Sequence, residues 1–295
     1  MPCVLPRLLK YRTKLQSDDA KDKRQASLSQ GNVIVCTHPK RNKANHMRTY
    51  RTGEIASLAR LHPNTIRLYE EIGFISKPER LPNGYRVYSD LHLEQVCCVR
   101  LALRAEVLQN GLRKTAVEII RLTAMQDYRA ARRQTQAYIE QINREIQLAK
   151  SAIQSVEEMI RHRTPPDAPS RRRGEAAEML GITVETLRNW ERNGLVSIRR
   201  SQNGYRVYEA ADLQRLLIIR TLRCANYSLS AILRLTGRLT RTEELSVADA
   251  LNHPSENEEI VSVCDHLLVA LSGAKDDAEQ MLLSIARMET LQTLH

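Results

Sequence analysis

An internal repeat places the strongest constraint on what this chain can fold into. The six residues Asn-Gly-Tyr-Arg-Val-Tyr occur at 83–88 and again, unchanged, at 203–208. The match extends upstream, where residues 65–75 align with residues 186–196. Such self-similarity indicates that one structural unit has been duplicated. A chain of 295 residues is long enough for about two domains, so the length agrees with this interpretation.

Each copy begins with a pattern typical of two short helices joined by a tight turn. In the first copy Thr52 is expected to cap one helix, and Pro63 to open a second helix that ends at Gly73. In the second copy Thr183 is the expected cap and Gly194 the expected stop. This arrangement predicts a helix-turn-helix in each copy. The inward positions of the second helices are expected to be Ile66, Tyr69, Leu187 and Trp190.

A small β wing is expected to follow each pair of helices. In the first copy Phe74-Ile75 and residues 85–88 flank Asn83-Gly84, and Asn-Gly is the strongest short-range hairpin signal. The repeated hexapeptide is therefore interpreted as the turn and return strand of a wing. Further helices are expected over 91–106, 112–125, 211–225 and 229–238.

Each copy then ends in a longer helix with an apolar heptad seam. The spacing alternates between three and four residues over about three heptads, which favours a coiled coil over a wide core-facing stripe. The first seam consists of Ile139, Ile142, Ile146, Ala149, Ile153, Val156 and Ile160. The second seam consists of Ile260, Cys264, Leu267, Leu271, Ala274, Ala278, Met281 and Ile285.

The predicted fold class is mainly α, with two winged helix-turn-helix domains that are each followed by a coiled-coil helix. Residues 1–47 lack a sustained hydrophobic period and are expected to form a basic, disordered tail. The other expected segments are a first winged domain over 48–128, its coiled-coil helix over 129–163, a Pro-rich linker over 164–170, a second winged domain over 171–240, and a connector with the second coiled-coil helix over 241–295.

The charge distribution points to an acidic partner. The formal net charge is +11, but residues 1–49 carry +8 and residues 237–295 carry −7, so the middle of the chain is strongly basic. A basic surface of this kind suits nucleic acid. No run approaches the roughly 18 apolar residues that span a bilayer, and the N-terminus lacks a secretion signal. We therefore expect no membrane partner and a cytoplasmic, nucleoid-associated location.

Three motifs of the first copy, in this order, resemble the MerR family of bacterial transcription regulators: Glu54-Ile-Ala, residues 65–74 and residues 83–88. The resemblance covers roughly 48–163 and again 171–292. It implies a regulator that binds double-stranded promoter DNA in which the spacer between the two polymerase-contact elements is too long. The regulator bends and untwists that spacer so that RNA polymerase engages both elements. It also implies two DNA-reading domains, or readers, joined by an antiparallel coiled coil. Here the readers would belong either to an intramolecular pseudo-dimer or to a homodimer.

The resemblance further implies that the second helix and the wing of each copy contact DNA. Arginines that recur outward in both copies are the main candidates, since phosphate contacts position a reader and base contacts specify sequence. The wing tyrosines are expected either to hydrogen-bond phosphates or to pack on the wing. The candidate DNA-binding residues are Asn64, Thr65, Arg67, Leu68, Tyr85, Arg86 and Tyr88 in the first copy, and Glu185, Thr186, Arg188, Asn189, Tyr205, Arg206 and Tyr208 in the second.

Positions where the copies differ bear on sequence preference. Asn64 aligns with Glu185, and Leu68 aligns with Asn189. Because Asn can read adenine and Glu can accept a hydrogen bond from cytosine N4, the two half-sites are expected to differ.

No catalytic constellation is present in the sequence: it shows no nucleophile–base set, phosphate loop or carboxylate pair typical of an enzyme. The six cysteines form no CxxC pair or disulfide framework, and the histidines have no ligand spacing. We expect no enzyme activity, no catalytic residue, no cofactor, no metal, and reduced thiols. The alternative function is that of a DNA-architectural or recombination accessory protein of the excisionase kind, which bends DNA without controlling a promoter.

Overall fold

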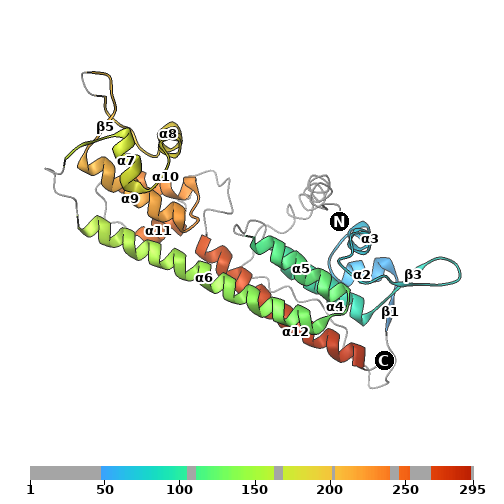
Figure 1. The fold of residues 1–295 in the computed structure, drawn as a ribbon. Coiled ribbons are helices and arrows are strands. Elements are labelled where there is room, and N and C mark those ends of the chain that lie inside the picture. Colours follow the sequence, from blue (N-terminus) through green and yellow to red (C-terminus); the bar gives the residue numbers. More distant parts are fainter. Residues whose placement is uncertain are drawn as a thin grey trace. The chain divides into compact units, whose positions relative to one another are not determined.

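The computed structural model describes residues 48–104, 111–162, 169–200, 203–239, 246–252 and 267–293. These residues are mainly helical, with small sheets beside the two helix-turn-helix regions (Figure 1). The fold class predicted from the sequence is therefore confirmed. The basic tail, most of the Pro-rich linker, and the seam positions Ile260 and Cys264 lie outside the described residues.

The first copy consists of two short helices and a three-stranded sheet. The helices are α2 (Thr52–Leu58) and α3 (Pro63–Glu71), and the strands are β1 (Thr49–Tyr50), β2 (Glu79–Arg80) and β3 (Arg86–Ser89). β3 pairs antiparallel with β1 on one side and β2 on the other. The strand opposite β3 in the wing is thus β2. Phe74 and Ile75 are instead buried in the core, because two adjacent large apolar side chains are stabilised more by burial than by a place in an exposed wing.

Local chemistry sets the ends of these helices. The cap of α2 is Arg51 rather than Thr52, because the Arg51 backbone N–H donates to the Glu54 carboxylate at 2.7 Å and closes the first turn. Pro63 is the first residue of α3, as predicted, and Gly73 follows its end with a positive φ of 73°.

The second copy repeats this order with a smaller sheet. It contains β4 (Arg171–Arg172), α7 (Arg173–Leu180), α8 (Val184–Arg192) and β5 (Val207–Tyr208), with β4 antiparallel to β5. Thr183 caps α8, as predicted, by accepting a hydrogen bond from the Thr186 backbone N–H at 3.1 Å. The four predicted inward residues of the two second helices are all buried: Ile66, Tyr69, Leu187 and Trp190.

The remaining helices complete each copy. The first copy continues as α4 (Asp90–Arg104), α5 (Leu112–Ala124) and the long α6 (Tyr128–Arg161). The second continues as α9 (Ala210–Cys224), α10 (Leu229–Leu239), the short α11 (Val247–Asn252) and the long α12 (Leu267–Thr293). The helix boundaries expected after the wings agree with α4, α5, α9 and α10 to within one or two residues. α11 was not predicted.

The two long helices pack against each other within the chain. Arg132 near the start of α6 forms an ion pair with Glu289 near the end of α12, which makes the pair antiparallel. Of the α12 seam, Leu271, Ala274, Ala278, Met281 and Ile285 are buried as expected.

The α6 seam differs from the prediction in its first half. Tyr138 is buried and Ile139 is only half-buried, and the seam continues toward the start of the helix through Thr135 and Ala131. The polar and small residues in this part of α6 hide the seam from a search for large aliphatic residues.

Each long helix also packs on the copy to which it does not belong in sequence. α12 of the second copy contacts α4 of the first, and α6 of the first copy contacts α9 of the second. Val156 and neighbouring apolar residues of α6 share a core cluster with Leu216 and Ile219 of α9. The two long helices therefore link the copies, with α6 packing on both α5 of its own copy and α9 of the other.

Candidate nucleic-acid interface

The second helix of each helix-turn-helix, α3 or α8, is here called its reading helix. Each reading helix presents one polar face outward. On α3 Asn64 and Arg67 are exposed, and on α8 the aligned Glu185 and Arg188 are exposed. Asn189 is exposed as well, whereas Thr65, Leu68 and Thr186 are half-buried. The buried face of each helix fixes its rotation, so these outward positions follow directly from the helical period.

The wing tyrosines divide into two kinds. Tyr85 and Tyr205, beside the wing turns, are 68% and 71% exposed. Tyr88 and Tyr208, on the return strands, are fully buried. Burial raises the pKa of Tyr88 above its ordinary value. Of the two roles predicted for the wing tyrosines, phosphate contact fits Tyr85 and Tyr205, while packing fits Tyr88 and Tyr208.

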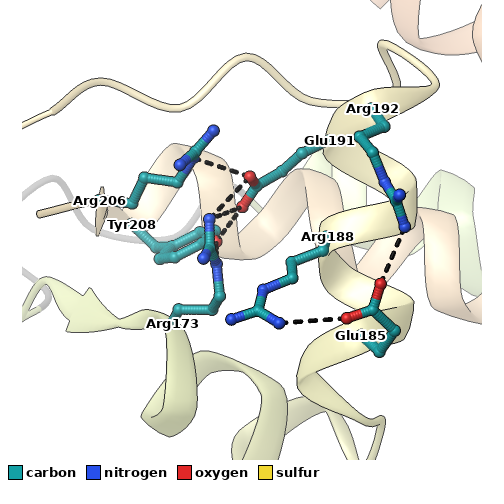
Figure 2. Close-up of polar contacts among 7 residues, drawn as sticks. All are labelled: Arg173, Glu185, Arg188, Glu191, Arg192, Arg206 and Tyr208. Atoms are coloured by element: carbon teal, nitrogen blue, oxygen red, sulfur yellow. Dashed lines mark hydrogen bonds and ion pairs between the residues drawn. The ribbon is translucent and has the colours of Figure 1, made fainter.

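The outward charges of the two reading helices are arranged differently. On α8 the Glu185 carboxylate pairs with Arg188 at 3.1 Å and with Arg192 at 2.8 Å (Figure 2). On α3 the amide oxygen of Asn64 accepts a longer contact of 3.4 Å from Arg67. Glu185 is well exposed, so these pairs contribute little to stability but do change the charge that the helix presents.

A second polar cluster ties the end of α8 to its wing. The Glu191 carboxylate lies at 2.7 Å from the Nε atom of Arg206 on the wing and at 2.9 Å from Arg173 at the start of α7. The Tyr208 hydroxyl also donates to Glu191 (Figure 2). The Glu191 side chain is only 9% exposed. One nearly buried carboxylate therefore joins α7, α8 and the wing.

Electrostatics in this cluster favour the charged arginine and the neutral tyrosine. Burial, and then the hydrogen bond to Glu191, raises the pKa of Tyr208 to about 12. The hydrogen bond with the Tyr208 hydroxyl, and then the Glu191 carboxylate, raises the pKa of Arg173. Both groups thus keep their donor protons at neutral pH.

The first copy contains the matching cluster with fewer members. The Glu70 carboxylate on α3 lies at 2.6 Å from the Nε atom of Arg86 on β3 and at 3.9 Å from Arg80 on β2. Thr52 occupies the position of Arg173, so in this copy no arginine contacts the carboxylate from the start of the first helix. Glu70 and Glu191 were not among the predicted site residues. The repeat aligns them with each other, and this identity is the sequence signal that could have indicated them.

Within the described residues, no group of three or more His, Cys, Asp or Glu side chains could hold a metal ion. Cys97 on α4 is disulfide-bonded, whereas Cys98 and Cys224 are free thiols. The expectation of reduced thiols is therefore wrong for Cys97. Among the described helices, none is both long and apolar enough to cross a membrane.

Comparison with known proteins identifies the repeated unit. Residues 51–88 match the model of the MerR family regulatory proteins, and residues 172–238 match that of the MerR HTH family regulatory proteins. The chain thus carries two tandem MerR-family helix-turn-helix domains. This assignment supports the expectation that the protein is not an enzyme.

Several curated proteins are similar to part of the chain. The nodulation protein NolA of Bradyrhizobium sp. (strain NC92) is 40% identical over 82 residues, which are 26% of this chain and 35% of that protein. The mercuric resistance operon regulatory protein of Bacillus cereus is 36% identical over 24% of this chain and 54% of its own length. The regulator ZntR of Escherichia coli K12 is 38% identical over 20% and 43%.

The chain therefore spans between about a third and a half of the length of these relatives. No solved structure matches the chain.

Proposed function

We propose that this protein is a sequence-specific DNA-binding transcription regulator whose two winged domains each read half of a site in duplex DNA. The observation that carries this proposal is the recurrence of the same outward set in both copies. Arg67 and Arg188 are exposed on the reading helices, and Tyr85 and Tyr205 on the wings. Cationic and hydroxyl donors at matching positions suit the phosphates and base edges of DNA.

The MerR-family domains support a specific mechanism. The protein bends and untwists the spacer of a promoter so that RNA polymerase engages both of its contact elements. A regulator of this kind must hold two readers in a fixed relation, because deforming DNA costs several kcal/mol that only simultaneous contacts offset. The relatives named above include the mercuric resistance operon regulatory protein, which agrees with control of a promoter.

One chain supplies both readers in this proposal. α6 and α12 form the antiparallel pair that a dimer would otherwise provide, and each packs on the opposite copy. We therefore propose an intramolecular pseudo-dimer, with the first winged domain over 48–128 and the second over 171–240.

The two half-sites differ in this proposal. The outward Asn64 suits adenine, while Glu185 suits the amino group of cytosine. Glu185 also offsets the charge of Arg188 and Arg192, so the second reader has less general attraction for phosphate than its arginine content indicates.

The test begins with selection of bound DNA from a random pool by the purified full chain, followed by sequencing. We expect an imperfect inverted repeat. Transcription in vitro from promoters that carry this site, with spacers shortened or lengthened by single base pairs, then tests the mechanism. The protein should stimulate the overlong spacer most. DNA bending without any effect on transcription would support the architectural alternative, and absence of DNA binding would refute both functions.

A further inference from the structure

The wing arginines are held in the same way in both copies. Arg86 meets Glu70 through its Nε atom at 2.6 Å, and Arg206 meets Glu191 through its Nε atom at 2.7 Å. Each glutamate lies near the end of its reading helix, and each arginine lies on the wing of the same copy. The contact therefore joins the two surfaces that would meet DNA.

The location of these carboxylates distinguishes them from ordinary surface pairs. The Glu70 and Glu191 side chains are 13% and 9% exposed, whereas Glu185 on the same helix as Glu191 is 63% exposed. A carboxylate removed from water has to be offset by charged donors, and these hydrogen bonds are short. The wing arginines remain 28% and 33% exposed, so the Nη edge of each guanidinium can still reach an acceptor outside the protein.

We propose that Glu70 and Glu191 are positioning residues for DNA binding. Each holds its wing arginine by the Nε edge and aims the Nη edge at one phosphate, so that the wing and the reading helix contact DNA in a fixed relation. This inference rests on the proposed function. It assigns a role to two acidic residues whose charge would otherwise repel phosphate.

The proposal predicts opposite effects on specific and non-specific binding. Replacing Glu70 by Gln removes the charge that holds and partly offsets Arg86. The released arginine can then neutralise any nearby phosphate, so non-specific affinity should rise while the aimed contact in the specific complex is lost. A fold that is simply damaged would lose both.

The magnitudes follow from counterion release. One additional neutralised phosphate steepens the plot of log K against log salt by about 0.9 and raises non-specific affinity about eightfold at 0.1 M salt. Loss of one oriented, charge-assisted hydrogen bond should weaken specific binding roughly tenfold. The ratio of specific to non-specific affinity should therefore fall by between one and two orders of magnitude.

The experiment compares full-length wild type, E70Q and the matched control E71Q. Glu71 is the next residue of α3, is exposed, and loses the same charge when replaced by Gln. Fluorescence anisotropy over a salt series would use two duplexes: the selected site and a scrambled sequence of equal length. We expect E71Q to resemble wild type in specific binding, and E70Q to show weaker specific binding with a steeper non-specific slope.

A double variant removes the remaining ambiguity. In E70Q/R86Q the released charge is gone, so the non-specific slope should return to the wild-type value or below it. E191Q provides the parallel test in the second copy. Because Glu191 also binds Arg173 and Tyr208, circular dichroism melting would check that this variant folds. If it does not fold, E70Q decides the question alone.

The outcomes separate this inference from the proposed function. If wild type binds no duplex, the proposed function is wrong. If wild type binds its site but E70Q and E71Q have equal slopes and equal specificity ratios, the function stands and the positioning role is refuted. A parallel loss of specific and non-specific binding in E70Q, with an unchanged slope, would also overturn it, because that is the signature of a purely structural glutamate.

Discussion

An ion pair between Arg104 and Asp277 joins α4 to α12. Replacing one residue of this pair should destabilise the protein more than replacing the other. Asp277 on α12 is 4% exposed and receives two contacts from Arg104 on α4, at 2.5 and 2.8 Å. Burial raises the pKa of Asp277 above its ordinary value, even though the Arg104 charge opposes this shift. Desolvation of the carboxylate is thus the larger effect, and the arginine offsets only part of it.

Replacing Arg104 by Ala should therefore destabilise the protein more than replacing Asp277 by Asn. Removing one partner of a fully buried pair costs about 3–5 kcal/mol. Arg104 is 40% exposed, and water can partly replace it, so we expect about 2–3 kcal/mol. Asp277→Asn removes the charge that burial penalises, so its cost should stay below about 1 kcal/mol.

The dependence on pH gives an independent check. A carboxyl group whose pKa is raised on folding contributes stability that is present at low pH and is lost as pH rises through the folded-state pKa. Without Arg104 the folded-state pKa of Asp277 should rise further. The penalty of Arg104→Ala should therefore be greatest near pH 7 and shrink as the pH falls toward 4.

Urea unfolding monitored by circular dichroism would measure these differences, with Arg132→Ala as the control. Arg132 pairs with Glu289 in the same helix assembly, but both side chains are nearly half exposed, so its loss should cost under about 1 kcal/mol. The reasoning would be refuted if Asp277→Asn were as destabilising as Arg104→Ala, or if the Arg104→Ala penalty did not change with pH.

Three further predictions concern DNA binding and assembly. Arg86→Ala combined with Arg206→Ala should weaken binding to all duplex sequences in gel shifts; unchanged shifts would contradict the assignment of the wings. Exchanging Asn64 and Glu185 should alter each half-site preference separately, by about 1–3 kcal/mol for a bidentate base contact; a selected site with two identical halves would argue against it. Light scattering at low concentration should give a mass near that of the 33.7 kDa chain; a persistent doubled mass would exclude the single-chain pseudo-dimer.

The sequence predicted the reading helices well because their signals are local. Pro63 is the first residue of α3, and Thr183 caps α8. The burial of Tyr69 and Trp190 follows from the helical period. The wing turn was likewise readable from Asn83-Gly84, whose Gly84 has a φ of 79°. In such segments a few neighbouring residues determine the backbone.

The carboxylate clusters could not be predicted in the same way. Glu191 meets Arg173 and Arg206 only after the chain has folded α7, α8 and β5 together, and no spacing along the sequence marks that encounter. The same holds for Arg104 and Asp277, which are far apart in the chain. Alignment of the repeats did contain one usable signal, since the glutamate after the inward aromatic residue is the same in both copies.

The faces of α4 and α9 on which the long helices pack have diverged since the duplication. On α4, Glu94 pairs with Arg287 of α12 at 2.8 Å. The repeat position on α9 is Gln214, whose side-chain amide donates to backbone carbonyls near the end of α6, including that of Met159.

At the other end of this face, the repeat aligns Arg104 of α4 with Cys224 of α9. If α12 docked on α9, Arg287 would meet a neutral amide and Asp277 a thiol, and both charges would lose their partners. Of the two, Asp277 is the buried one, and burying a charge without a partner is unfavourable by several kcal/mol. The divergence of these two positions therefore favours α12 on α4 and α6 on α9 over the like-with-like alternative. Two copies of one unit have in this way become complementary halves whose seam helices are not interchangeable.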